Sequence, residues 1–564
     1  MSWGTFGAAR PMWRVYILVA LAGTASAYVA TDEVMVLPGW SGKLPSRMFS
    51  GYLDATPQGE TVYKLHMHYT FWESEGDPAK DPLLIWSNGG PGAGSEFGAF
   101  TEIGPLLLYD ASMQTKEYNT TGIPTLFQNP QAWTKVASLL IYDAPPPVGF
   151  SYCNNNPGGD GYSCGDWDDF RTARSVHTFV ENFMRAFPEY AQHDLYLSGE
   201  SYAGVYIPML AREILQDTSS PTAAHLRGML IGDGCTGTDV LCGNAPGHNG
   251  PWFHMQFFHG HGAVSDKLYD EIVDTCGVAQ LKAGITDPKC ESLVKSMDTA
   301  IGGYFDYAYY DECSPDTYIS PAPGFAAQRS RRYWSSVPPL RTAPQDGGLG
   351  GALNDYPCGG VHAMLTWLNA SAVKKALNVP PDAYFFLTDN GVGFNYSLTE
   401  KNLMPFYQQV VNEKRMRVVV YNGDTGTRER LERTRYGAPR LVFCLQPAPG
   451  LRSAPLTRRL RSSLAAADPG INSFVSQNWT VALGFKETQA WRPWTVDGKQ
   501  QMGGYVTRYE NNFDFLTIRG AGHMVPEFKP TASLAFLTAF LKNEDYMPYV
   551  KPPPKSPIGK KHEL

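Results

Sequence analysis

Short apolar runs that stop at turn-forming residues are the feature of this sequence that most constrains its fold. They occupy residues 83–86, 138–142, 195–197 and 418–421. Runs of this length and composition are typical of parallel strands that are buried on both faces. Helical apolar spacing recurs between and after them, at residues 171–187 and 532–541. The alternation predicts an α/β fold with a mostly parallel central sheet flanked by helices.

The middle of the chain breaks this alternation. From Cys235 to about Cys358 the sequence is rich in cysteine, tyrosine and glycine and lacks the strand–helix pattern. We therefore expect an inserted cap subdomain at about residues 235–358, covering the strand ends.

The charge of the chain excludes one class of partner. The formal net charge is −7, and no basic tract is longer than two or three residues outside the extreme C-terminus. A protein that binds nucleic acid would need a basic patch or stripe. We expect no nucleic acid partner.

The N-terminus has the pattern of a signal peptide. Arg10 and Arg14 precede an apolar run at residues 15–22, and Ala-Ser-Ala at 25–27 supplies a cleavage site after Ala27. The alternative is a membrane anchor, but the apolar run is much shorter than the roughly 20 residues that span a bilayer. We expect residues 1–27 to be removed, residues 28–564 to form one domain, and no stable membrane anchor.

Sequons and cysteines fit entry into an oxidising lumen. Four N-glycosylation sequons begin at Asn119, Asn369, Asn395 and Asn478. The nine cysteines are an odd number, so one must be left over. Short separations favour three pairs, although sequence alone does not fix connectivity. These pairs are Cys153 with Cys164, Cys235 with Cys242 and Cys276 with Cys290. Cys313 and Cys358 would then form a fourth pair, and Cys444 would be left over.

Residues 199–204 (GESYAG) have the context of a nucleophile elbow. They follow the predicted strand at 195–197 and precede the apolar run at 205–210, so a sharp strand-to-helix turn would lift Ser201 above the sheet. Ala203 stands where the second glycine of the G-x-S-x-G pattern would be, but a small side chain still relieves crowding there. A chance turn is the alternative for this motif alone.

Two further turns follow predicted strands. Residues 88–92 (NGGPG) could bring backbone N–H groups close to a substrate oxygen, although an ordinary Gly/Pro turn is the alternative. His523, in residues 520–526, follows the apolar run at 515–518; a lone histidine is usually structural. Together, however, Ser201, an aspartate-bearing turn after residue 421 and His523 follow the order nucleophile, acid, histidine.

With these motifs the chain resembles the serine carboxypeptidase family. The resemblance covers residues 35–425 and 468–545. It rests on residues 86–92, 149–152, 199–204, 421–424 and 520–526. It implies an α/β-hydrolase fold with an inserted cap, and removal of C-terminal residues from peptides through an acyl-enzyme at acidic pH. Neither a metal nor an organic cofactor is implied, because a triad and an oxyanion hole suffice for this chemistry.

The resemblance assigns roles to individual residues. Ser201 would be the nucleophile and His523 the general base, and the backbone N–H groups of Gly90 and Tyr202 would form the oxyanion hole. The substrate's free C-terminal carboxylate would be held by Trp86, Asn88, Glu102 and Glu200. The two glutamates and the substrate carboxylate cannot all be ionised so close together, so we expect at least one glutamate to stay protonated. Substrate binding should therefore weaken as pH rises.

The triad acid departs from the family pattern. The family has a second aspartate in a Gly-Asp-x-Asp turn, but this chain continues from Asp424 to Thr425 and Gly426. The expected aspartate reappears at Asp468, and joining Thr425 to Asp468 restores the turn. Asp468 is our predicted triad acid and Asp424 a weaker candidate.

The intervening residues 426–467 differ in composition from the rest of the chain. They contain nine arginines, two glutamates and neither lysine nor aspartate, a charge of +7 where the remainder carries −14. We hypothesise that residues 426–467 come from a retained intron or a gene-model error. The alternative is that they form a true insertion loop. Looping out such a segment costs only a few kcal/mol. Folding therefore remains possible with the insert present.

Location, partners and competing functions complete the predictions. Residues 561–564 (Lys-His-Glu-Leu) are similar to an endoplasmic reticulum retention signal, with a chance tail as the alternative. The family is mostly lysosomal, vacuolar or secreted.

Partners would be peptides or proteins with a free C-terminus, and a homodimer is a guess from the family. Hydrolysis competes with acyl transfer to a small alcohol and with a non-catalytic binding or protective role.

Overall fold

The structure, a computed structural model, describes Met1 and residues 31–154, 164–242, 250–302, 307–310, 360–387, 395–425 and 471–552. Several predictions from the sequence fall outside these residues. They are the signal peptide at residues 1–27 apart from Met1, the insert at 426–467, Asp468, the C-terminal Lys-His-Glu-Leu, and Cys313, Cys358 and Cys444.

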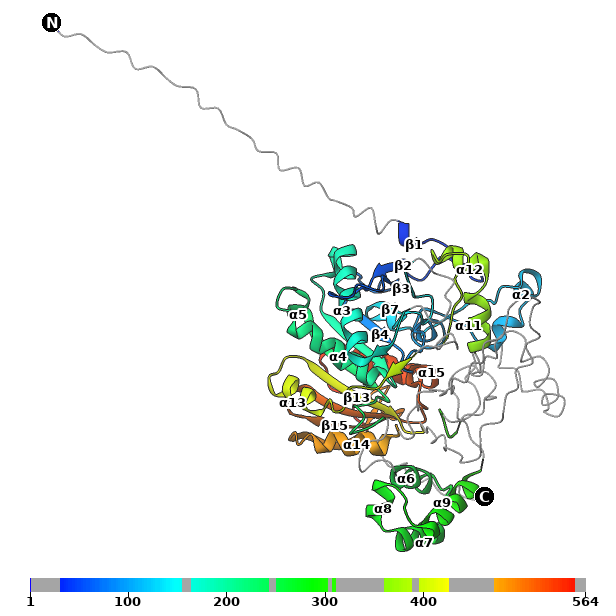
Figure 1. Cartoon of the computed structure of the whole chain (residues 1–564), viewed down its shortest axis with the longest axis vertical. Coiled ribbons are helices and arrows are strands. Elements are labelled where there is room, and N and C mark those ends of the chain that lie inside the picture. The colour runs from blue at the N-terminus through cyan, green and yellow to red at the C-terminus, as the bar shows by residue number, and fades with distance from the viewer. Residues whose placement is uncertain are drawn as a thin grey trace, which may run out of the picture.

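A twelve-stranded sheet forms the centre of the molecule (Figure 1). Eleven strands follow the order β1-β2-β3-β7-β4-β10-β11-β13-β16-β15-β14, and β8 pairs with β3. The six strands from β7 to β16 run parallel, and antiparallel strands flank them on both sides. The strands are β1 (Glu33–Val34), β2 (Met48–Asp54), β3 (Leu65–Trp72), β4 (Leu83–Ser87), β7 (Ser138–Tyr142), β8 (Tyr152–Cys153), β10 (Leu195–Glu200), β11 (Leu226–Gly232), β13 (Arg417–Gly423), β14 (Glu487–Thr495), β15 (Met502–Tyr509) and β16 (Phe513–Ile518).

Helices cover both faces of this sheet. Because side chains alternate along a strand, Val418 and Val420 of β13 pack into one core while Val419 and Tyr421 pack into the other. Helices α3, α4, α13 and α14 contribute to the first core, and α11, α15 and α16 to the second. The helices are α2 (Lys116–Thr121), α3 (Asp169–Ala186), α4 (Ala203–Gln216), α5 (Thr222–His225), α6 (Trp252–Gly260), α7 (Asp266–Cys276), α8 (Val278–Ala283), α9 (Pro288–Ile301), α11 (Val361–Leu368), α12 (Ser371–Ala376), α13 (Met404–Asn412), α14 (Ser473–Ala482), α15 (Val525–Phe528) and α16 (Pro530–Lys542).

The elements predicted from the apolar runs are present. The four predicted strands correspond to β4, β7, β10 and β13, and every residue of β7 is buried, as a strand covered on both faces requires. The predicted helix at residues 171–187 is α3, whose N-cap Asp168 accepts a hydrogen bond from the backbone N–H of Arg171. The predicted helix near the C-terminus is α16.

Helices α6 to α9 form a separate group below α14 in the view of Figure 1. They pack around a small core of their own, which includes Phe258, Ile272 and Met297. The Nδ2 of Asn472, at the start of α14, donates to the carbonyl of Phe253 in α6. This group lies within the expected cap at residues 235–358, whose bounds stay a prediction because residues 311–359 lie outside the described part.

Three disulfides confirm the three short-range pairings. They join Cys153 to Cys164, Cys235 to Cys242 and Cys276 to Cys290, with Cα–Cα distances of 5.7, 5.3 and 5.1 Å. The last links α7 to α9 in the small helical group, where it supplements a limited core. Within the described residues, none of the helices combines the length and apolar character needed to cross a membrane.

The sequons differ in accessibility. Asn119 on α2 and Asn478 on α14 are exposed, as is Asn395. Asn369 is only half-exposed, and its Nδ2, the atom that would carry a glycan, donates to the carbonyl of Leu365 at 3.0 Å.

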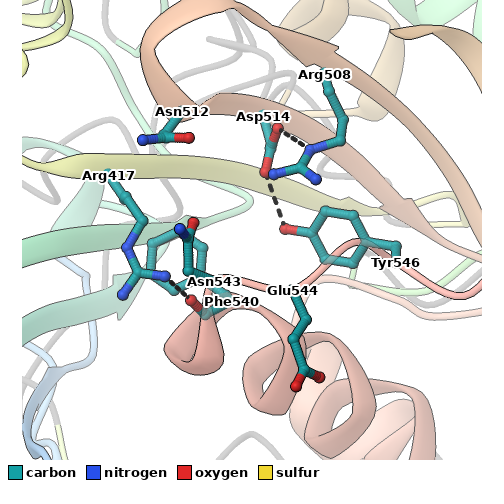
Figure 2. Close-up of a pocket in the computed structure, with 8 residues that line it drawn as sticks. All are labelled: Arg417, Arg508, Asn512, Asp514, Phe540, Asn543, Glu544 and Tyr546. Atoms are coloured by element: carbon teal, nitrogen blue, oxygen red, sulfur yellow. Dashed lines mark hydrogen bonds and ion pairs between the residues drawn. The ribbon is translucent and has the colours of Figure 1, made fainter.

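The pocket in Figure 2 lies at the amino ends of β13 and β16, so it is at the end of the parallel strands opposite Ser201. Here the Arg417 guanidinium donates to the carbonyls of Phe540 and Leu541, which are last-turn carbonyls of α16. The Phe540 carbonyl also accepts the N–H of Asn543, so Arg417 gives it a second hydrogen bond, while the Leu541 carbonyl receives a donor from outside the helix. Arg417, which lines this pocket, therefore anchors the end of α16 to the sheet.

We predict that Arg417→Met lowers the free energy of unfolding by about 1–3 kcal/mol, because the substitution keeps the apolar stem and removes the charged donor of the hydrogen bonds to the last-turn carbonyls of α16. Urea unfolding measures the change. Lys267→Met, which removes an exposed cation from α7, should change stability by less than about 0.5 kcal/mol. Equal stabilities for the two variants would contradict the anchoring role.

Candidate active site

Ser201 occupies a strained turn between β10 and α4. Its φ angle is +62°, in the left-handed region that residues other than glycine seldom adopt. Three backbone hydrogen bonds hold it there: its N–H donates to the carbonyl of Gly232 at 2.9 Å, and its carbonyl accepts from the N–H groups of Gly204 and Cys235 at 2.9 and 3.0 Å. This is the geometry of a nucleophile elbow.

Small residues make this turn sterically possible. A Cβ added to Gly199 would lie 2.4 Å from the carbonyl oxygen of Ser87 and 2.6 Å from the Cβ of Ala203. A Cβ on Gly204 would lie 2.3 Å from the carbonyl oxygen of Cys235. The Cβ of Ala203 therefore lies directly against Gly199, and this small side chain fits where the strict pattern has glycine.

The glycine-rich turn at residues 88–92 packs directly against this elbow. A Cβ on Gly89 would lie 2.3 Å from the backbone nitrogen of Tyr202 and 2.8 Å from the Cβ of Ser201. Gly90 has a φ of +112°, which only glycine adopts without strain. The backbone N–H groups of Gly90 and Tyr202 therefore belong to two turns in contact, next to the Ser201 side chain.

A hydrogen-bonded network of buried side chains extends from the turn. The Oδ1 of Asn88 accepts from Trp86 Nε1 at 2.9 Å and from the N–H of Gly98 at 3.1 Å. Its Nδ2 donates to the Oε1 atoms of both Glu102 and Glu200, each at 3.0 Å. Because donors surround Oδ1 and acceptors surround Nδ2, the amide has one satisfactory orientation. The four residues that the family resemblance placed in one pocket are therefore in contact.

The two glutamates are held in a state that favours protonation. Burial raises the pKa of Glu102 to about 7. Burial and then the neighbouring charge of Glu102 raise the pKa of Glu200 well above its usual range. The pKa of each carboxyl group also depends on the other, and a proton on one of them relieves the repulsion between the two. At mildly acidic pH the network therefore contains a carboxylic acid that can donate a hydrogen bond.

His523 lies on the loop after β16, buried beside the end of β13. Its backbone N–H donates to the carbonyl of Tyr307 at 2.7 Å, and the two rings are 5.3 Å apart. Thr425 fastens the loop to β13, because its N–H and Oγ1 both donate to the carbonyl of Ala521. The ends of β13 and β16 are thus fixed together at the edge of the sheet where Ser201 lies.

Two aspartates follow strands of this edge, Asp424 partly buried and Asp233 fully buried. Asp424 accepts a hydrogen bond from the N–H of Gly520 at 2.5 Å, and burial raises its pKa to about 6. Asp233, which our sequence analysis did not single out, follows β11 and accepts from Asn422 Nδ2 and the N–H of Gly423. Its position after a buried strand was the signal that could have identified it. Asp468 lies outside the described residues.

Comparison with known proteins identifies the family. The model of the serine carboxypeptidase family matches residues 38–436 and 464–543. The chain belongs to the serine carboxypeptidase family. Serine carboxypeptidase 1 of Hordeum vulgare is 28% identical over 540 residues, which cover 90% of this chain and 92% of that protein. The lysosomal protective protein of Mus musculus is 28% identical and covers 94% and 98%.

A solved structure supports the fold. The prohormone-processing carboxypeptidase from Saccharomyces cerevisiae superposes with a TM-score of 0.59 at 19% identity, covering 91% of this chain and 96% of that one. The α/β-hydrolase fold predicted from the sequence is confirmed, as are the family and the enzyme class. The protein is a serine-type carboxypeptidase, and hydrolysis through an acyl-enzyme at acidic pH is a general property of its family.

We predict that the free energy of unfolding of this carboxypeptidase falls as pH rises from about 5 to 7. The folded state keeps a proton on Glu102 up to about pH 7, whereas an unfolded glutamate releases it near 4.5, so deprotonation favours unfolding. Glu102→Gln should reduce this loss by up to about 3 kcal/mol, measured by urea unfolding at several pH values. The control is Glu117→Gln, at an exposed position on α2. The same pH slope in all three proteins would contradict the assignment.

Proposed function

We propose that this carboxypeptidase removes C-terminal residues from peptides and proteins with a free C-terminus, using Ser201, Asp468 and His523 as its triad. The observation that carries the proposal is the buried network of Asn88, Glu102 and Glu200 beside the elbow. Glu200 is the last residue of β10 and immediately precedes Ser201. A subsite for a carboxylate this close to the nucleophile accommodates a single residue beyond the scissile bond, which makes an exopeptidase.

The chemistry follows from the order of the groups. Ser201 Oγ attacks the carbonyl carbon of the last peptide bond while His523 accepts the hydroxyl proton. The N–H groups of Gly90 and Tyr202 stabilise the negative oxygen of the tetrahedral intermediate, and removing one such donor typically costs about 3 kcal/mol. His523 then gives the proton to the leaving amine. Water, activated in the same way, hydrolyses the acyl-enzyme and regenerates Ser201.

Recognition of the substrate carboxylate explains an acidic working range. In our proposal a protonated Glu102 or Glu200 donates a hydrogen bond to the carboxylate, and Asn88 and Trp86 complete the subsite. Because the pKa of Glu102 is raised to about 7, the donor is present below that pH and is lost above it. Binding of substrates with a free carboxylate should then weaken through neutral pH.

Asp468 is our choice for the triad acid for two reasons. Joining Thr425 to Asp468 restores the Gly-Asp-x-Asp turn of the family. The family model also resumes at residue 464, leaving residues 437–463, inside the predicted insert, unmatched. Asp424 already accepts the N–H of Gly520, so its carboxylate has a structural task within its own turn.

Ser201→Ala should lower kcat for an N-blocked dipeptide by more than about 10⁴-fold at mildly acidic pH, because the acyl-enzyme can no longer form. Substrate binding should be retained. Ser219→Ala, at an exposed serine after α4, is the control and should keep full activity. Activity that survives Ser201→Ala would exclude Ser201 as the nucleophile.

Deleting residues 426–467 should raise kcat/KM at least tenfold over the full chain, since the deletion brings Asp468 back next to Thr425. In the deleted form, Asp468→Asn should lower kcat by about 10⁴-fold and Asp424→Asn by far less. Equal activity of the full and deleted chains would mean that the insert loops out harmlessly. Inactivity of both, with both folded, would favour the acyltransferase or non-catalytic alternative.

We further propose that residues 1–27 direct the protein into the secretory pathway, where a lysosome or vacuole supplies the acidic pH. The supporting comparison is the similarity to a lysosomal protective protein along nearly the whole chain. Retention by the C-terminal Lys-His-Glu-Leu and homodimer formation stay predictions from the sequence and the family.

A further inference from the structure

Three charged side chains that the proposed mechanism does not use meet next to the glycine-rich turn. His68 is on β3, Glu96 follows β4, and Asp143 follows β7; these strands are neighbours in the sheet (Figure 1). The His68 Nδ1 is 3.3 Å from Glu96 Oε1 and 3.5 Å from Asp143 Oδ2. All three side chains are completely buried.

The two carboxylates of this cluster anchor loops. Asp143 Oδ1 accepts from the N–H of Ser95 at 2.8 Å, and its Oδ2 accepts from the N–H of Phe150 at 3.0 Å. Glu96 Oε1 accepts from Thr70 Oγ1 on β3 at 2.5 Å. The cluster thereby fixes the segment after β4 to both β3 and the loop at residues 149–151.

Only two hydrogen bonds separate this cluster from the proposed carboxylate subsite. The N–H of Ser95 bonds to Asp143, and the Oγ of Ser95 accepts from the N–H of Asn88 at 3.1 Å. Asn88 in turn bonds to Glu102 and Glu200. Gly90 lies between Asn88 and Ser95, so the same connection fixes one of the proposed oxyanion donors.

Stability alone is a poor reason for this arrangement. Buried ion pairs add little net stability because desolvation offsets their attraction, and apolar side chains of similar volume often do as well. Removing one partner, however, leaves an uncompensated buried charge. Buried ion pairs can instead favour one conformation of the surrounding chain over others. In this protein the segment whose conformation they would fix is residues 88–98.

We propose that His68 is a positioning residue, whose ion pairs with Glu96 and Asp143 hold residues 88–98 so that Asn88 and the N–H of Gly90 face the substrate. The inference rests on the proposed function of those two residues. His68 does not touch the substrate; it acts through Asp143 and Ser95.

The charge on His68 persists across the working range. Burial alone would lower the pKa of His68, but Asp143 and Glu96 raise it to about 9. The other titratable groups near it are Tyr52, whose ring is 5.3 Å away, and Asp32. The stabilisation from this cation is complete below the unfolded-state pKa of 6.5 and is lost as pH rises through about 9.

His68→Gln is the first test, because it removes the cation and keeps a polar side chain. Active sites are counted by titration with an organophosphonate, which reacts with the serine. Per titrated site, we expect kcat/KM for a peptide with a free C-terminus to fall at least tenfold. The preference for that peptide over its C-terminal amide should shrink by a similar factor. An effect confined to the unfolding temperature and the number of titratable sites would overturn the proposal.

Arg508→Gln is the matched control. It breaks an ion pair with the buried Asp514 at the opposite end of the sheet (Figure 2). This variant should lower the unfolding temperature and leave both the KM and the acid-over-amide preference per site unchanged. A preference lost equally in Arg508→Gln would show a general effect of instability and overturn the inference.

Two further measurements keep the inference testable if His68→Gln does not fold. Ser95→Ala removes the hydroxyl between Asp143 and Asn88 and should reduce the same preference; an unchanged preference contradicts the proposal. Metal analysis of the purified enzyme should find no stoichiometric divalent cation. A cation bound by His68, Glu96 and Asp143 would require a neutral imidazole and would replace the ion-pair account. If the unmodified enzyme shows no preference for the acid over the amide, the proposed carboxylate subsite is wrong. The positioning role of His68 is then tested by comparing kcat per titrated site in His68→Gln and the unmodified enzyme.

Discussion

Strands β4 and β10 are hydrogen-bonded neighbours with Ser87 opposite Gly199, so the turns that follow them begin side by side. Each turn restricts the other. Gly89 has no room for a side chain because the nitrogen of Tyr202 occupies that space, and Ser201 keeps its left-handed backbone because β11 accepts its N–H. The proposed nucleophile, oxyanion donors and carboxylate subsite all depend on this one backbone contact.

Two buried charge networks surround that contact, and they respond differently to protons. Among the described residues, the charges that act most strongly on Glu200 are those of Glu102, Asp233 and Glu527, which are all negative, so binding a proton relieves the repulsion in this pair. The cluster around His68 contains its own cation and keeps its charge well beyond neutral pH. The first network senses the acidity of the compartment, while the second is a fixed scaffold throughout that range.

The sequence predicted the parts of this protein that local patterns encode. Strand β7 was predicted to the residue, because both of its faces are buried and its five residues are followed by Asp143 and, after Ala144, by three prolines. The mostly exposed β14 has no such apolar run, and it was missed. The cluster of His68, Glu96 and Asp143 was missed for another reason: its members come from three separate segments, which only the sheet order brings together. The Asn88 network was predicted through family resemblance, since periodicity alone gives no hint of it.

The arrangement around Asn88 also bears on how the protein ages. Asparagine followed by glycine is the sequence most prone to lose its side-chain amide, because the next backbone nitrogen can swing round and attack the amide carbon. Here Asn88 is followed by Gly89, but both atoms of the amide are hydrogen-bonded and Gly89 is pressed against the neighbouring turn. Loss of the amide nitrogen would set a third carboxylate against Glu102 and Glu200. The bonds that orient the amide therefore also give a chemically fragile pair of residues a long lifetime.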